Sequence, residues 1–187
     1  AYLQPIIDIV RVDPPYIGPS LAEGADIWGV RRRGVSYGSG SYDEIEHYPL
    51  ASAHSPADLA AHTWPDPDWF DYQAMPYLIR AARESGEKCV MVWNGNIFET
   101  SWYMRGFEQM LMDLMSNEEM VLAIMERVTS FYIEHFSRVL AAAPGEVDLV
   151  FTADDIGDQR GLLIPLERWE RLLKPFHQRL NAAIHDG

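Results

Sequence analysis

The stretch VDLVFTADDIGDQRG, residues 147–161, decides how this chain folds. It begins with a short apolar run that ends at Phe151 and predicts a buried strand. Three aspartates, an arginine and two glycines follow, and a helical pattern begins near Pro165. Loops that leave the carboxyl ends of parallel strands are where α/β proteins bind ligands. The stretch therefore predicts a strand, a ligand-binding loop and a helix, with a solvated turn as the plain alternative for the loop.

The same order of strand, polar loop and helix occurs earlier in the chain. Residues 88–93, KCVMVW, predict a second buried strand, and Asn94, Gly95 and Asn96 follow as a tight turn. The helical periodicity predicts helices at 70–84, 97–115, 117–143 and 166–185, the last bent at Pro175. Strands that alternate with helices predict a parallel sheet with right-handed crossovers.

The first 70 residues are less regular than residues 71–187. Proline, glycine, tyrosine, serine and aspartate are frequent there. The patterns predict a strand at 6–12, a second apolar run at 25–30, a turn-rich hairpin at 34–48 and a short helix that begins at Ser55. We therefore expect one domain, residues 1–187, with an irregular first part and regular β/α units after it.

The composition is that of a folded and strongly acidic chain. Of its 187 residues, 48% are hydrophobic and 12% aromatic, which suits one sizeable core and excludes a disordered chain. A formal net charge of −13 repels phosphate backbones and anionic lipids, so we expect neither nucleic acid nor a membrane as partner. A single cysteine, Cys89, excludes a disulfide framework. No apolar run approaches the ~20 residues of a membrane span and no leader pattern opens the sequence, so we expect a cytoplasmic protein.

The number of predicted strands is too small for a complete barrel. A (β/α)8 barrel needs eight strands, and the sequence offers about four. The chain stops at a helix end that would precede a further strand. We therefore predict part of a (β/α)8 TIM-type barrel, incomplete in this chain, with an open sheet.

Several motifs resemble the uroporphyrinogen decarboxylase superfamily, which includes the heme-pathway decarboxylase and the cobalamin- or corrinoid-linked methyltransferases. The motifs follow in family order: GADIWGV at 24–30, WPDPDWFDY at 64–72, the loop and helix at 93–106, DDIGDQRGLLIP at 154–165 and LLKPF at 172–176. Together they span most of residues 6–187. None of them is specific for one reaction, so the resemblance implies the barrel type and an enzyme of this superfamily.

The resemblance also implies site residues. In the decarboxylases an aspartate in a Ser-Asp-Ile-Leu context binds the pyrrole NH groups and a tyrosine of a later helix supports it; Asp26 and Tyr103 stand at the matching places. The decarboxylase loop Glu-Ser-His-Ala-Gly aligns with residues 153–157, where Asp154 and Asp155 replace Ser-His. Its Ala-Pro-Trp-Thr pattern is replaced by NGNIFE at 94–99. Both departures argue against the heme-pathway reaction.

The methyltransferase branch uses zinc to activate a thiolate or another acceptor. Its His-x-Cys ligand motif would belong just after Gly187, and the six histidines of this chain form no HxH or HxxxH pair. We therefore expect no metal and no cofactor within these residues, and zinc and a corrinoid partner protein for the full-length enzyme. Carboxylate-only sites for Mg²⁺ or Ca²⁺ at Asp154, Asp155 and Asp158 stay open.

The chemistry of the residues supports two catalytic candidates. An ionised Asp26 could stabilise a cationic intermediate, and the Tyr103 phenol could hold that carboxylate in place. The plain alternatives are an ion pair of Asp26 with a neighbour such as Arg31, and a packed tyrosine. The substrate-binding candidates are Trp93, Asn94, Asn96, Asp154, Asp155, Asp158 and Arg160.

Asp154 and Asp155 should do different jobs, because successive side chains leaving a strand point to opposite sides. The one that faces the barrel mouth is the ligand candidate. The other should cap the following turn or pair with Arg160.

The functional prediction is corrinoid-linked methyl transfer on a small-molecule methyl donor or acceptor. The first alternative is decarboxylation of uroporphyrinogen III to coproporphyrinogen in porphyrin biosynthesis. The second is a non-catalytic subunit that binds a tetrapyrrole or corrinoid. We expect the chain by itself to be inactive, and the sequence leaves a homodimer open.

Overall fold

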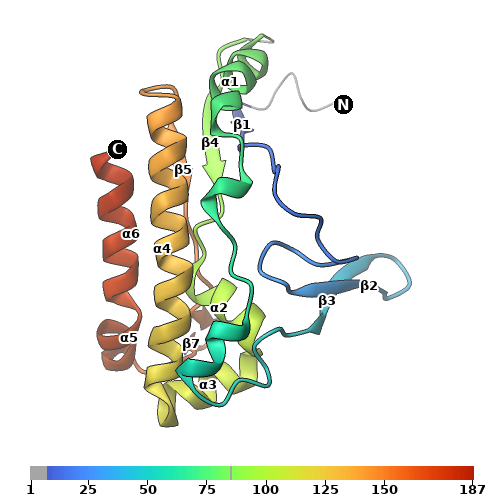
Figure 1. The fold of residues 1–187 in the computed structure, drawn as a ribbon, viewed down its shortest axis with the longest axis vertical. Helices are drawn as coiled ribbons and strands as arrows, with labels where there is room; N and C mark the ends of the chain where they lie inside the picture. Colours follow the sequence, from blue (N-terminus) through green and yellow to red (C-terminus); the bar gives the residue numbers. More distant parts are fainter. Residues whose placement is uncertain (1–7, 85) are drawn as a thin grey trace.

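A three-stranded parallel sheet forms the centre of the computed structural model, which describes residues 8–84 and 86–187 (Figure 1). Its strands are β1 (Ile9–Arg11), β4 (Cys89–Trp93) and β5 (Leu149–Phe151), in the order β1-β4-β5. Both neighbouring pairs are parallel, with Val10 opposite Val90 and Val92 opposite Val150. The predicted strands at 88–93 and 147–151 are therefore confirmed, as is the strand at 6–12 from Ile9 onwards. Ile6 and Ile7 lie outside the described residues.

Helices connect the strands and account for most of residues 75–187. They are α1 (Met75–Arg83), α2 (Ile97–Arg105), α3 (Phe107–Ser116), α4 (Glu118–Ala142), α5 (Leu166–Leu172) and α6 (Lys174–Asp186). In the described part of the chain they are preceded by short 3-10 helices: η2 (Pro56–Ala61), η3 (Pro67–Trp69) and η4 (Tyr72–Ala74). The long helix α4 and the C-terminal helix α6 lie side by side (Figure 1). None of the helices in the described part has the length and apolarity that a membrane span requires.

Two predicted helices are each divided in two. The helix predicted at 97–115 breaks at Gly106, whose φ of 95° belongs to the left-handed region that glycine adopts most readily. The helix predicted at 166–185 breaks at Leu173, because Pro175 lies in the first turn of α6, where its missing N–H costs nothing. Both breaks redirect the chain, so α3 and α6 can pack against α4.

The irregular first part forms a hairpin that projects from the helical body (Figure 1). Strands β2 (Arg31–Ser36) and β3 (Ser41–His47) pair antiparallel, so the predicted hairpin is confirmed and begins earlier than expected. The apolar run at 25–30 does not form a strand; it is a turn held by a single bridge between Ala25 and Arg31. A second small hairpin, β6 (Gly157–Asp158) with β7 (Gly161–Leu162), lies in the loop after β5 and was not predicted.

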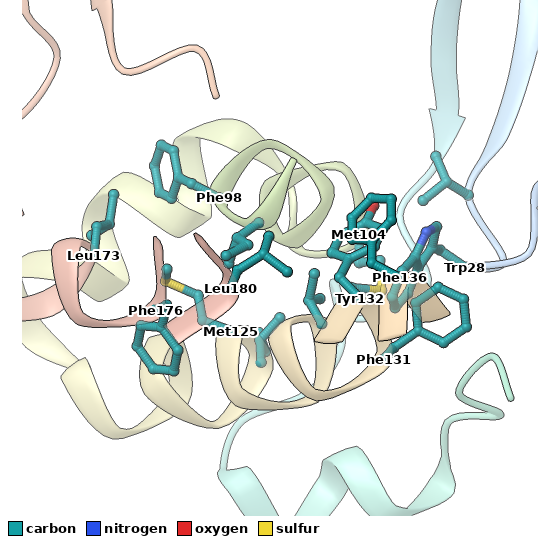
Figure 2. Close-up of a cluster of buried hydrophobic side chains, with 14 of the residues drawn as sticks. Trp28, Phe98, Met104, Met125, Phe131, Tyr132, Phe136, Leu173, Phe176 and Leu180 are labelled. Atoms are coloured by element: carbon teal, nitrogen blue, oxygen red, sulfur yellow. The ribbon is translucent and has the colours of Figure 1, made fainter. Parts of the chain in front are cut away.

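The hydrophobic core lies between α4 and the elements around it. Figure 2 shows side chains of α2, α4 and α6 meeting there, with Trp28 of the turn before β2 at one end. The ring of Trp28 meets Phe131 edge to face at a centroid distance of 5.1 Å. This contact ties the irregular first part of the chain to the helical body.

The two faces of the sheet differ in their cover. Val90 and Val92 are fully buried beneath the helices. Residues on the other face are partly open: Ile9 is 47% exposed, Trp93 37% and Leu149 41%. The described residues therefore form an open sheet and not a closed barrel, as the strand number predicted.

Candidate functional site

Asp26 organises the turn that leads into β2. One carboxylate oxygen accepts hydrogen bonds from the backbone N–H groups of Trp28, at 2.9 Å, and Val30, at 3.1 Å. The other oxygen pairs with the Arg32 guanidinium at 2.6 Å. The ion-pair alternative is therefore realised, with Arg32 and not Arg31 as the partner, because the turn directs Arg32 back over Asp26.

Tyr103 reaches the same arginine from α2. The Arg32 guanidinium lies 4.8 Å from the centre of the Tyr103 ring, a cation–π arrangement. The phenol does not bond to Asp26 directly; it donates to the Glu99 carboxylate one helical turn earlier. Burial, with that hydrogen bond, raises the pKa of Tyr103 and keeps it protonated. Both predicted catalytic residues, Asp26 and Tyr103, therefore contact the Arg32 guanidinium. The Tyr103 hydroxyl, however, bonds to Glu99 and not to Asp26.

Glu99 was not predicted, and it stands at the centre of the polar network. One oxygen accepts from Tyr103, and the other accepts from the Asn96 side-chain amide at 2.6 Å. Asn96 also accepts a bond from the backbone N–H of Ala153, at 3.3 Å, which links this network to the loop after β5. The i, i+4 spacing of Glu99 and Tyr103 in the first helix after β4 is the signal that could have found it.

Asp154 is buried, with a side chain only 4% exposed. Its two oxygens accept from the backbone N–H groups of Phe98, at 2.9 Å, and Glu99, at 2.7 Å. These amides belong to the first turn of α2, which has no partner for them within the helix, and whose dipole favours a negative charge. Asp154 therefore caps α2 from a loop more than 50 residues later in the chain.

His177 of α6 completes this anchor. Its Nε2 lies 2.6 Å from Asp154, and its Nδ1 lies 3.0 Å from the Leu173 carbonyl. A carboxylate and a carbonyl both accept, so this arrangement favours the imidazolium, in which both ring nitrogens donate. Burial alone would lower the pKa of His177, but the hydrogen bond and the charge of Asp154 outweigh it and raise that pKa. The sequence alone assigned no role to this histidine.

The remaining acidic residues of the loop separate into two environments. Asp155 is exposed, and its negative charge is one of the lesser causes that raise the pKa of Tyr103. Asp158 accepts from the backbone N–H groups of Arg160, at 2.7 Å, and Gly161, at 3.1 Å, and closes the β6–β7 turn. Asp154 and Asp155 do differ in environment as predicted, but the buried one caps a helix, and Asp158 closes the turn.

A small pocket of about 110 Å³ lies beside this network, at the carboxyl ends of β1 and β4. Trp93 stacks on Phe151 of β5, with ring centres 4.2 Å apart. Asn94, with a φ of 90°, donates its backbone N–H to the Phe151 carbonyl at 3.2 Å. The pocket is lined by Arg11, Asp13, Pro14, Ile27, Trp28, Phe70, Trp93, Asn94, Phe131, Tyr132 and His135. Two predicted substrate-binding residues therefore line one cavity at the expected edge of the sheet.

The pocket and the polar network are in contact. The Tyr132 hydroxyl, at the pocket, lies 2.9 Å from the Thr100 hydroxyl of α2. Ile27 and Trp28, which also line the pocket, directly follow Asp26. Across residues 8–84 and 86–187, no three His, Cys, Asp or Glu side chains are grouped so that they could hold a metal ion.

The comparisons with known proteins give one structural likeness. No family model matches the chain, and no curated protein sequence matches it either. A methyltransferase from Methanosarcina mazei has a similar fold, with a TM-score of 0.61 and 14% sequence identity. The match covers 98% of this chain and 50% of that protein, so the chain spans about half its length. At this identity the likeness shows the fold alone: an α/β arrangement with a parallel sheet and covering helices.

Proposed function

We propose that this chain is part of an enzyme of the uroporphyrinogen decarboxylase superfamily that carries out corrinoid-linked methyl transfer at the mouth of a (β/α)8 barrel. The observation that carries this proposal is the convergence of Asp26, Tyr103, Glu99 and Asp155 beside a pocket at the carboxyl ends of parallel strands. In barrel enzymes this edge of the sheet holds the active site. The motif resemblance and the fold of the M. mazei methyltransferase support the same reading.

The half barrel is supported by the open face of the sheet. Parallel sheets occur almost only with both faces covered, and here the described residues cover the face of Trp93 and Leu149 only in part. The similar structure is twice as long as the part that this chain matches. Further β/α units that continue the sheet from β1 and β5 would enclose this face as a barrel interior.

Within this mouth the residues of the chain have separable roles. Arg32 and Tyr103 hold the Asp26 and Glu99 carboxylates in fixed positions. Asp155 is exposed and free of such fixed backbone bonds within the described part, so it can meet a substrate. A corrinoid on a partner protein would supply cobalt as the methyl carrier. The stacked Trp93 and Phe151 rings offer a flat apolar surface of the kind that a corrinoid face requires.

Decarboxylation is less well supported by the geometry. A carboxylate that grips pyrrole NH groups must present free oxygen lone pairs to the substrate. Both Asp26 oxygens already accept bonds, from two backbone amides and from Arg32. One acceptor site of the carboxylate is left, so binding several pyrrole NH groups there would require Arg32 to leave, at the cost of its ion pair and its contact with Tyr103.

The test uses the enzyme with its flanking sequence, assayed with methylcobalamin and a thiol acceptor and, separately, with uroporphyrinogen III. We expect methyl transfer, reduced at least about tenfold (~1.4 kcal/mol) by Glu99→Gln, which weakens the grip on Tyr103. Tyr77→Phe, at an exposed position of α1, is the matched control and should leave the rate unchanged. Coproporphyrinogen formation without methyl transfer would establish the decarboxylase instead. Binding of cobalamin or porphyrin with neither reaction would indicate a non-catalytic subunit.

A further inference from the structure

His135 lines the pocket at the ends of β1 and β4 and is hydrogen-bonded to the half-buried Tyr72 behind it. His135 of α4 is 8% exposed, and its Nδ1 lies 3.0 Å from the Tyr72 hydroxyl. The imidazole packs between Phe70, at 4.9 Å, and Phe131, at 5.6 Å, measured between ring centres. Neither Tyr72 nor His135 belongs to the polar network around Glu99.

The tyrosine selects one tautomer of the histidine. Burial lowers the pKa of His135 to about 4 and raises the pKa of Tyr72 to about 12, so both groups are neutral near pH 7. A phenol is a much better hydrogen-bond donor than acceptor, so the Tyr72 hydroxyl donates to Nδ1. The ring proton then lies on Nε2. His135 is therefore held as a neutral ring with a fixed N–H donor.

That donor has no partner within the described part of the chain. The structure gives His135 one hydrogen bond, at Nδ1, and the ring lines the pocket. The charged groups that face it are already paired: Arg11 binds Asp13, and Asp13 also accepts from the backbone N–H of Trp93, at 3.3 Å. The rest of the wall is largely aromatic. The pocket thus combines one free neutral donor with apolar surfaces and a balanced charge.

We propose that this pocket is a binding site for a small neutral molecule whose oxygen acceptor, as in an alcohol, ether, ketone or amide, receives the hydrogen bond of His135 Nε2. A cavity of about 110 Å³ holds about three to four waters' worth of volume, or a ligand of about four to six heavy atoms. The Asp13 carboxylate would repel an anion. The Arg11 guanidinium, which lies over the Trp93 ring, would repel a cation. This binding site does not depend on which reaction the enzyme catalyses.

The experiment titrates the ¹⁵N-labelled chain of residues 1–187 with three probes of similar size. These are N-methylacetamide as the neutral oxygen acceptor, tetramethylammonium as the cation and acetate as the anion. The readouts are the side-chain signals of His135 and the indole signals of Trp28 and Trp93. We expect N-methylacetamide to shift all three in the millimolar range, and the two ions to leave them nearly unchanged, since so small a ligand binds weakly at best.

Two variants test the donor itself. His135→Phe keeps a ring in the wall and removes the N–H, so N-methylacetamide should bind about fivefold more weakly, the value of one neutral hydrogen bond. Tyr72→Phe frees the tautomer and should weaken binding by a smaller factor, whereas Tyr77→Phe on the exposed surface of α1 should not change it.

The probe comparison needs no variant, so it stands even where a substitution unfolds the chain. Preference for tetramethylammonium would overturn the proposal in favour of an aromatic cation cage, and preference for acetate would make the site an Arg11 anion site. Absence of any shift at the three side chains, or unchanged binding by a folded His135→Phe variant, would also overturn it.

Discussion

The two faces of the parallel sheet show how differently one set of strands can be used. Val90 and Val92 face the helices and are fully buried, whereas their neighbours Trp93 and Leu149 face away and are partly open. The covered face fixes the fold, and the open face with its strand ends carries the exposed groups of the candidate site.

The largest expected effect compares one substitution on the two faces. Val92→Asp buries a carboxylate without a partner and should destabilise the chain by about 4 kcal/mol or more. Leu149→Asp, at a 41% exposed position of the adjacent strand, should cost about 1 kcal/mol or less. Urea unfolding followed by circular dichroism measures both. Similar losses from the two variants would show that the face of Leu149 is already covered in the 187-residue chain, for example in a dimer.

The second comparison concerns the neighbouring aspartates. Asp154→Asn removes a buried charge that caps α2 and pairs with His177, and should cost about 2–3 kcal/mol of unfolding free energy. Asp155→Asn is exposed and should change stability by about 0.5 kcal/mol or less, although it should lower the activity of the full enzyme. Thermal unfolding and the methyl-transfer assay separate the two effects. Equal stability losses would contradict the assignment of the cap to Asp154.

The third prediction follows from the raised pKa of His177. The folded state holds this proton more tightly than the unfolded chain, so the pair contributes fully below the unfolded pKa of about 6.5. The contribution is lost as the pH rises through the raised folded pKa, by up to about 1.4 kcal/mol per unit of separation. His177→Gln should flatten the stability profile on this alkaline side. An unchanged profile in that variant would mean that the ring is not an imidazolium. His135, with its lowered pKa, has the opposite sign and costs stability as the pH falls below about 6.5.

The smallest expected effect comes from comparing the exposed Asp158 with the buried Asp154. Asp158 accepts two backbone bonds, as Asp154 does, but it closes an exposed turn where water can replace the carboxylate. Asp158→Ala should therefore cost about 0.5–1 kcal/mol, well below the loss in Asp154→Asn. Hydrogen exchange at Gly161 should rise in this variant while exchange in α2 stays the same. A loss as large as that of Asp154→Asn would contradict the exposed-turn assignment.

The sequence by itself determined the order of the elements. The apolar runs at 88–93 and 147–151 and the helical periodicity between them depend on neighbours along the chain, and the structure has them where predicted. It also placed the polar loops at the strand ends, since that position follows from the alternation of strand and helix. Its main error within the elements was local: the helix predicted at 97–115 breaks at Gly106.

Which polar groups meet depends on how the folded chain packs. Asp154 caps a helix that begins more than 50 residues earlier, and its third partner, His177, is 23 residues later. The Tyr103 hydroxyl was expected to bond to Asp26 but bonds to Glu99, and Arg32 contacts both Tyr103 and Asp26. A side chain chooses its hydrogen-bond partner by distance in space and by burial, which the packing of α2 and α6 on α4 sets. The residue pattern along the chain records neither quantity, so it can suggest candidate residues but not the contacts that they make.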